Sequence, residues 1–121
     1  MSQIAGRLWA LGAFFALMGV APLAAQPIPV PSDPRASYTA LQVTPQPDGQ
    51  VTILTRRAGP SGTSFALREV DCRGDRARYL GEGDTAEEAQ RRRAPGTMAP
   101  LAPGSISWHV ARFACAAAGG R

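Results

Sequence analysis

The chain contains two cysteines, Cys72 and Cys115, and a bond between them would close a loop over about half of the residues expected to fold. An even cysteine count in an exported domain indicates a disulfide. On the chain-entropy model, closing a loop of this length stabilises the folded state by about 4 kcal/mol. Redox and metal chemistry are weaker alternatives, because CxxC spacing is absent and one histidine adds too few zinc ligands. We therefore expect a structural disulfide and no bound metal.

Export is itself predicted from residues 1–25. One basic residue, Arg7, precedes a long apolar run, and small alanines stand directly before Gln26. This order is typical of a secretory signal peptide, with cleavage expected after Ala25. An uncleaved anchor is the alternative, although residues 8–25 are barely long enough to span a bilayer. No later apolar run is long enough to span one, so we expect no transmembrane segment after cleavage. The expected location is the periplasm, the cell surface or the medium.

The charge of the chain argues against nucleic acid as a partner. All 13 basic residues are arginine, and the net charge is only +4. A nucleic-acid-binding domain is normally far more basic on one face, and export makes this partner less suitable still. The glycine-rich stretches at 59–62 and 81–84 lack the strand–loop–helix pattern of a phosphate site, and the chain has no lysine. We expect no cofactor.

The mature part divides into a spacer, one domain and a tail. Residues 26–35 carry four prolines, which predicts an extended linker, or alternatively a short proline-rich ligand for a partner. Residues 36–116 form the predicted single antiparallel β domain, and residues 117–121 a disordered tail. Turn signals such as Asp48-Gly49 and Gly74-Asp75 separate segments of strand composition. Strands are expected at 38–43, 51–57, 63–73, 77–80 and 105–115.

Two of these strands change the parity of their apolar residues. Phe65 and Leu67 alternate on one phase, whereas Val70 and Cys72 alternate on the other. A β-bulge near Arg68-Glu69 would bring all four to one face. The segment 105–115 shows the same change, which predicts a second bulge near Ala111-Arg112.

One short peripheral helix completes the prediction. Thr85 with Glu88 three residues later is a capping-box pattern, and the segment ends in Arg91, Arg92 and Arg93. The fold class is therefore mainly β, a small antiparallel sheet with one short helix and one disulfide. The three arginines form either a solvated helix end or an anion-binding patch.

His109 is the only histidine, so any acid–base chemistry near neutral pH would centre on it. Ser107 would share its face in a strand, and Asp71 could approach across the sheet, which would make a hydrolase triad. However, neither a nucleophile elbow nor a pocket supports this set. We expect the two side chains to face solvent or a loop, and predict no catalytic residues.

The cysteine-bearing segments LREVDC (67–72) and VARFAC (110–115) resemble those of the surface-adhesin protein E family. The resemblance implies a short exported protein with an antiparallel sheet, a small helical element and a similar cysteine pair. It also implies an interaction module rather than an enzyme. No ligand-binding motif of the family can be matched residue by residue.

The expected function is that of a small non-enzymatic envelope protein, an adhesin-like or structural module with an unidentified envelope or extracellular protein as partner. An accessory or inhibitor subunit of an envelope enzyme or secretion complex is the alternative. A small hydrolase using His109 is the third.

Overall fold

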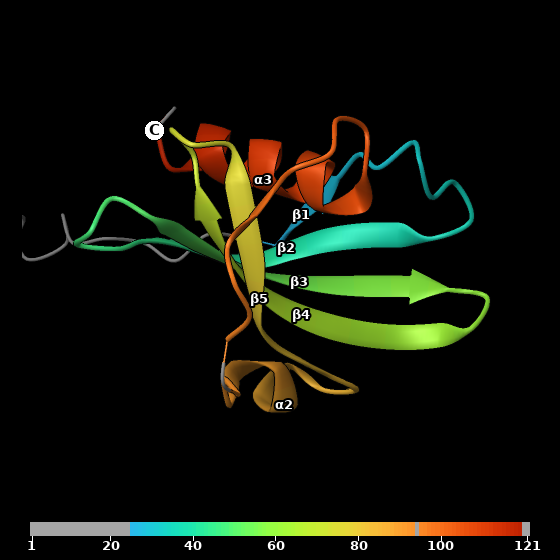
Figure 1. Cartoon of the computed structure of the whole chain (residues 1–121). Helices are drawn as coiled ribbons and strands as arrows, with labels where there is room; N and C mark the ends of the chain where they lie inside the picture. The colour runs from blue at the N-terminus through green and yellow to red at the C-terminus, as the bar shows by residue number, and fades with distance from the viewer. Residues whose placement is uncertain (1–24, 94, 120–121) are drawn as a thin grey trace, which may run out of the picture.

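The fold is a six-stranded antiparallel sheet with two helices, described by a computed structural model for residues 25–93 and 95–119 (Figure 1). Strands that follow one another in the chain also lie side by side in the sheet. Antiparallel neighbours need no crossover, so a short connection can join one strand to the next. The predicted mainly β fold is confirmed, although the sheet is larger than expected and a second helix is present. The elements are β1 (Gln26–Ile28), β2 (Ser37–Pro45), β3 (Val51–Gly59), β4 (Gly62–Asp71), β5 (Arg76–Gly83), α2 (Ala86–Gln90), β6 (Ala99–Pro100) and α3 (Ile106–Ala117).

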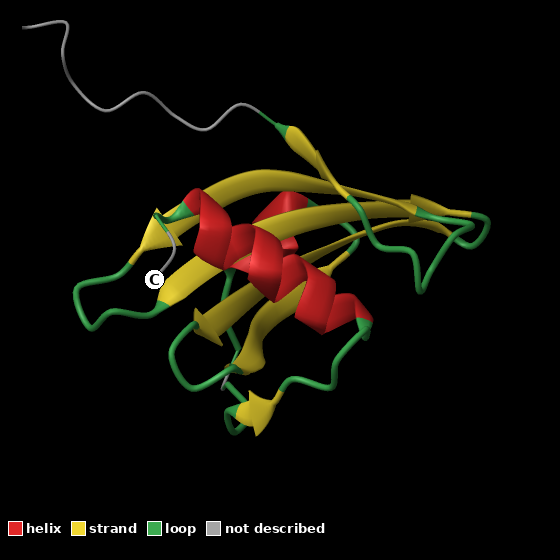
Figure 2. Ribbon diagram, turned by 90° about the horizontal axis from the view of Figure 1, so that it is seen from above, coloured by secondary structure: helices red, strands yellow, loops and turns green. Residues whose placement is uncertain are grey.

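The sheet buries side chains on both faces. Figure 1 shows α3 on one face and α2 on the other, and in Figure 2 α3 lies across the strands. Alternation along β3 sends Val51 and Ile53 toward α3 and Leu54 toward α2. The larger core lies under α3 and includes Val110, while the smaller one lies against α2 and includes Ala89.

This arrangement explains the parity change in β4 and corrects the prediction of a bulge. Phe65 and Leu67 pack in the α2-side core, whereas Val70 and Cys72 belong to the α3-side core. The register between β3 and β4 is unbroken, so the four residues never share a face. Because each face is covered by a helix, apolar residues occur on both parities of one strand. The irregularity falls instead on the pairing with β5, where Leu80 is the extra residue.

The expected last strand is wrong: residues 106–117 form helix α3. Ser105 caps its N-terminus by accepting a hydrogen bond from the backbone N–H three residues later, at 3.2 Å. The buried residues of α3 are Val110, Ala111 and Ala114, which recur at helical spacing. The change of parity that predicted a second bulge is instead explained by the 3.6-residue period of a helix. The prediction of a second bulge is therefore wrong.

The expected linker is also wrong, because residues 26–30 belong to the domain. β1 pairs with β2 at the edge of the sheet, and Ile28 and Val30 are buried in the α3-side core. Prolines 27 and 29 alternate with them. Proline is tolerated on an edge strand, where a missing N–H breaks no ladder bond.

The remaining boundaries agree in part with the expectation. The capping box of Thr85 and Glu88 is confirmed, and α2 is a short helix as predicted. The expected tail begins too early, since α3 extends to Ala117. Of the predicted signal peptide, all but Ala25 lies outside the described residues. Within the part of the chain that the structure describes, neither helix has the length and apolar character needed to cross a membrane.

Candidate functional site

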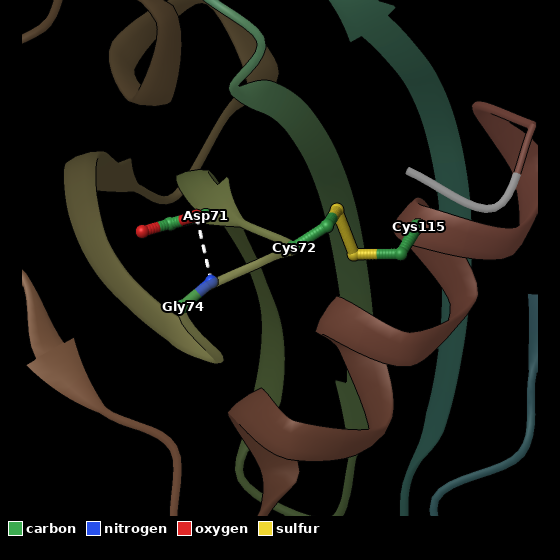
Figure 3. The surroundings of a disulfide bond; sticks show 4 residues. All are labelled: Asp71, Cys72, Gly74 and Cys115. Atoms are coloured by element: carbon green, nitrogen blue, oxygen red, sulfur yellow. Dashed lines mark hydrogen bonds between the residues drawn. A yellow bond between two sulfur atoms is a disulfide. The ribbon is translucent and has the colours of Figure 1, made fainter.

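The predicted disulfide is confirmed and fixes α3 to the sheet. Cys72 directly follows β4 and Cys115 lies near the end of α3, with 5.9 Å between their Cα atoms (Figure 3). Next to it, the Asp71 carboxylate accepts a hydrogen bond from the backbone N–H of Gly74 at 2.9 Å, which closes the turn after β4. The sheet and α3 are therefore joined covalently at one end of the helix.

The structure does not support the hydrolase triad. Ser107 and His109 lie two residues apart on a helix rather than a strand, so their side chains point to different sides. Both are half-buried, and the His109 ring packs edge-on against Trp108 with 4.9 Å between centroids. The Ser107 hydroxyl accepts a hydrogen bond from Arg68. Asp71 is used in its own turn. Within the described ranges, no three His, Cys, Asp or Glu side chains are grouped as metal ligands would be.

Arg68, for which the sequence predicted no functional role, is buried on the side of the sheet that faces α3. Arg68 on β4 is only 4% exposed. Its Nε donates to the Ser107 hydroxyl at 3.1 Å, Nη1 to the Thr55 hydroxyl at 3.1 Å, and Nη2 to the Tyr79 hydroxyl at 3.0 Å. Its guanidinium also lies 4.7 Å from the centre of the Tyr79 ring. Arg68 shares its parity with Val70, so a charge on the apolar face of the strand was the signal available in the sequence.

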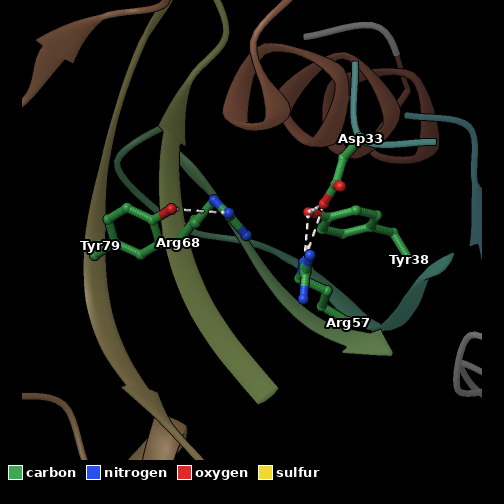
Figure 4. A network of polar contacts seen from close by, with 5 residues as sticks. All are labelled: Asp33, Tyr38, Arg57, Arg68 and Tyr79. Carbon is green, nitrogen blue, oxygen red and sulfur yellow. Dashed lines mark hydrogen bonds and ion pairs between the residues drawn. The ribbon is translucent and has the colours of Figure 1, made fainter. Parts of the chain in front are cut away.

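A second arginine on the same face provides a contrast. Arg57 on β3 forms an ion pair with Asp33, with 3.0 Å between Nε and Oδ2, and also donates to the Tyr38 hydroxyl at 3.1 Å (Figure 4). Tyr38 donates to the same carboxylate oxygen at 2.6 Å. The hydrogen bond from Tyr38, and then that from Arg57, lower the pKa of Asp33. Burial, and then the hydrogen bond to Asp33, raise the pKa of Tyr38. The charge of Arg57 is thus balanced within the domain.

Arg68 lines two cavities. The larger, of about 390 Å³, lies between β5, β6 and the start of α3, and we call it the Arg68 pocket. Its wall combines the polar residues Arg68, Arg78, Ser105 and Ser107 with largely apolar side chains, among them Ala77, Tyr79, Ala99, Pro100 and Leu101. The smaller cavity, of about 160 Å³, reaches toward Arg57 and Glu82. Tyr79 lines both and is 42% exposed, which is the largest exposure of a bulky apolar side chain in the described structure.

The arginines proposed as an anion patch lie on the other side of the sheet. Arg91, Arg92 and Arg93 follow α2 and are exposed. The backbone N–H of Arg93 donates to the carbonyl oxygen of Leu80 at 3.0 Å, so this residue also holds the end of the segment against β5. Arg92 lines a cavity of about 250 Å³ together with Gln42, Gln46 and Gln90. An anion-binding role for the three arginines stays a prediction, as does the alternative of a solvated helix end.

Arg68 supplies the Arg68 pocket with a buried cationic group. An arginine side chain is a cation with five N–H donors and no acceptor, so it can hold a negatively charged or hydrogen-bond-accepting group. Comparisons with protein-family models, with characterised proteins and with solved structures each gave no match. The pocket is therefore interpreted from its own geometry.

Proposed function

We propose that this chain is a small exported binding protein of the cell envelope, non-enzymatic, which recognises its partner at the Arg68 pocket. One observation carries the proposal: a cavity of about 390 Å³ that is lined by a buried cation together with apolar side chains. Binding sites are typically concave and mostly apolar, with a few polar groups that orient the ligand. The pocket has this composition, and its volume lies at the lower end of the usual range for ligand pockets.

The scaffold around the pocket supports a role in recognition. Its walls come from β5, β6 and the N-terminal end of α3, which are separate in the chain. The Cys72–Cys115 bond holds the other end of α3 against the sheet, so the helix that forms one wall cannot separate far from the strands. A preformed site loses less conformational entropy on binding. A disulfide also suits an oxidising compartment, in agreement with the export expected from residues 1–25.

The resemblance to the surface-adhesin protein E family supports the same role. The antiparallel sheet, the helix and the paired cysteines are features that the resemblance implies, and this chain has them. We propose that the likeness extends to an interaction function. The partner is not carried over, because no family binding motif matches these residues.

The first experiment tests export and the pocket together. The complete chain is expressed in a bacterial host with a photo-cross-linking amino acid at Thr97, an exposed residue in the wall of the pocket. The matched control carries it at Ser61, which is exposed in the turn between β3 and β4. We expect an envelope protein whose mass begins at Gln26, with no alkylatable thiol, and cross-linked adducts at Thr97 only. Free thiols, a full-length mass or equal cross-linking at both positions would contradict the proposal.

A further inference from the structure

Arg68 is a buried cation whose hydrogen-bond partners are all neutral. Its guanidinium carries five N–H donors, and three are directed at the hydroxyl oxygens of Ser107, Thr55 and Tyr79. Nη1 and Nη2 each carry two N–H bonds, and each makes one of these contacts. One donor on each terminal nitrogen is therefore left for another acceptor.

No carboxylate of the described chain balances the charge of Arg68. Both ion pairs found in residues 25–93 and 95–119 are made by other arginines, Arg57 with Asp33 and Arg78 with Glu69. Glu82 lines the smaller cavity together with Arg68, but the two form no ion pair and Glu82 is exposed. Buried arginines are normally paired, because removing a charge from water without a counter-charge is strongly unfavourable. The site thus has an unbalanced positive charge next to a cavity.

The surroundings of Arg68 restrict what can supply the counter-charge. One unbalanced arginine with two remaining donors suits a single carboxylate, which accepts hydrogen bonds with its two oxygens. Part of the wall of the Arg68 pocket is apolar, formed by Ala99, Pro100 and Leu101 of the segment that contains β6. A hydrated inorganic anion would leave this wall without a contact, whereas an apolar group attached to the carboxylate would cover it.

We propose that the Arg68 pocket binds a carboxylate attached to an apolar group, with the carboxylate on Arg68 and the apolar group against residues 99–101. This inference rests on the proposed binding function and adds the ligand chemistry. A free aliphatic acid and the carboxyl terminus of a protein that ends in an apolar residue both have this chemistry. Tyr79 accepts a hydrogen bond from the guanidinium with its hydroxyl, and its ring centre lies 4.7 Å away, so it acts as a positioning residue.

Calorimetric titration of the purified protein with matched pairs of probes tests the proposal. The first pair is octanoate and octanamide, and the second is acetyl-Ala-Leu with a free or an amidated carboxyl group. We expect one acid at least to bind about tenfold or more tighter than its amide, because charge-assisted hydrogen bonds are lost in the amide. A preference confined to octanoate identifies a free acid as the source, and one confined to the peptide identifies a carboxyl terminus. Equal affinity for acid and amide in both pairs would overturn the proposal, and this comparison requires no variant.

Variants then assign the effect to Arg68. In Arg68→Met, the acid should bind about as weakly as its amide, and in Arg73→Met, which removes an exposed arginine, the preference should persist. Glu82→Gln should leave the affinity unchanged or increase it, because it removes a nearby negative charge. An undiminished preference in Arg68→Met, or phosphate binding as tight as that of the acid, would refute the assignment. Cross-linking at Thr97 without any acid preference would leave the proposed function standing and remove only this inference.

Discussion

Removing the Cys72–Cys115 disulfide should greatly destabilise this domain. The two residues are 43 apart in sequence, so the bond closes a loop that contains β5, α2, β6 and nearly all of α3. On the chain-entropy model, a loop of this length restricts the unfolded chain by about 4 kcal/mol. Domains of this size have total stabilities of roughly 5–15 kcal/mol, so this one bond is a large part of the total.

The variant Cys72→Ala/Cys115→Ala removes the bond and leaves no free thiol. Urea unfolding followed by circular dichroism should show a free energy of unfolding lower by about 4 kcal/mol. A domain of under 100 residues loses roughly 4–8 °C in Tm for each kcal/mol, so Tm should fall by about 15–30 °C. The slope of the unfolding free energy against urea should rise, because the unfolded chain without the bond is more expanded.

The reduced native protein is the matched control, since it contains the same loop and keeps both sulfur atoms. It should unfold at nearly the same urea concentration as the double alanine variant. A loss of less than about 1 kcal/mol in both would refute the loop-entropy argument. A large loss in the variant alone would show that packing of the half-buried cysteines, rather than the bond, is responsible.

Three smaller perturbations test other parts of the fold. Gly81→Ala would place a methyl group against the backbone carbonyl of Ala89, so we expect α2 to be displaced. The free energy of unfolding, measured in urea, should fall by about 1–3 kcal/mol. Thr85→Ala removes the N-cap of α2 and should cost about 1 kcal/mol by the same measurement. Burial raises the pKa of Tyr38, so its neutral form favours the folded state. The contribution of Tyr38 to the free energy of unfolding is therefore complete below its ordinary pKa of 10.0 and is lost as the pH rises through the folded pKa. In Tyr79→Phe, where Tyr38 is the only tyrosine left, phenolate absorbance should appear at higher pH in the folded protein than in urea.

Local signals in the sequence predicted the centre of the sheet well. Asp48-Gly49 lies in the turn between β2 and β3, and Gly49 has the positive φ of 89° that such a turn requires. The capping box at Thr85 was predicted because its two hydrogen bonds join residues only three positions apart. The disulfide was predictable since no other cysteine competes for either partner.

The errors arose where one pattern fits two structures. Ile106, Val110 and Phe113 have the spacing of a helical stripe, yet Ile106, Trp108 and Val110 also alternate as in a strand. A short apolar segment satisfies both periods, and only packing against the sheet decides between them. In the same way, the prolines of residues 26–30 suit an extended linker and an edge strand equally.

The Arg68 pocket could not be predicted, because its parts come together only in the folded chain. Ser107 is 39 residues from Arg68 in sequence, and Thr55 is 13 residues away on the neighbouring strand. Because residues 105–115 were assigned to a strand, the prediction did not place Ser107 over β4. The parity shared by Arg68 and Val70 would have indicated a buried charge, but not what surrounds it.

Burial of Arg68 leads to a last prediction, which separates a binding role from a structural one. Desolvation of the guanidinium opposes folding, and hydrogen bonds to Ser107, Thr55 and Tyr79 offset it without a counter-charge. In Arg68→Met, the Tyr79 hydroxyl is free to meet water and Thr55 still donates to the Ala66 carbonyl oxygen, so few polar groups lose all partners. Replacing buried charges by apolar groups of similar size is often neutral or stabilising. We therefore expect the free energy of unfolding in urea to stay within about 1 kcal/mol or to increase, while acid binding is lost. A loss of about 3 kcal/mol or more would mean that Arg68 serves to hold α3 on the sheet, and the unbalanced charge would then have a structural reason.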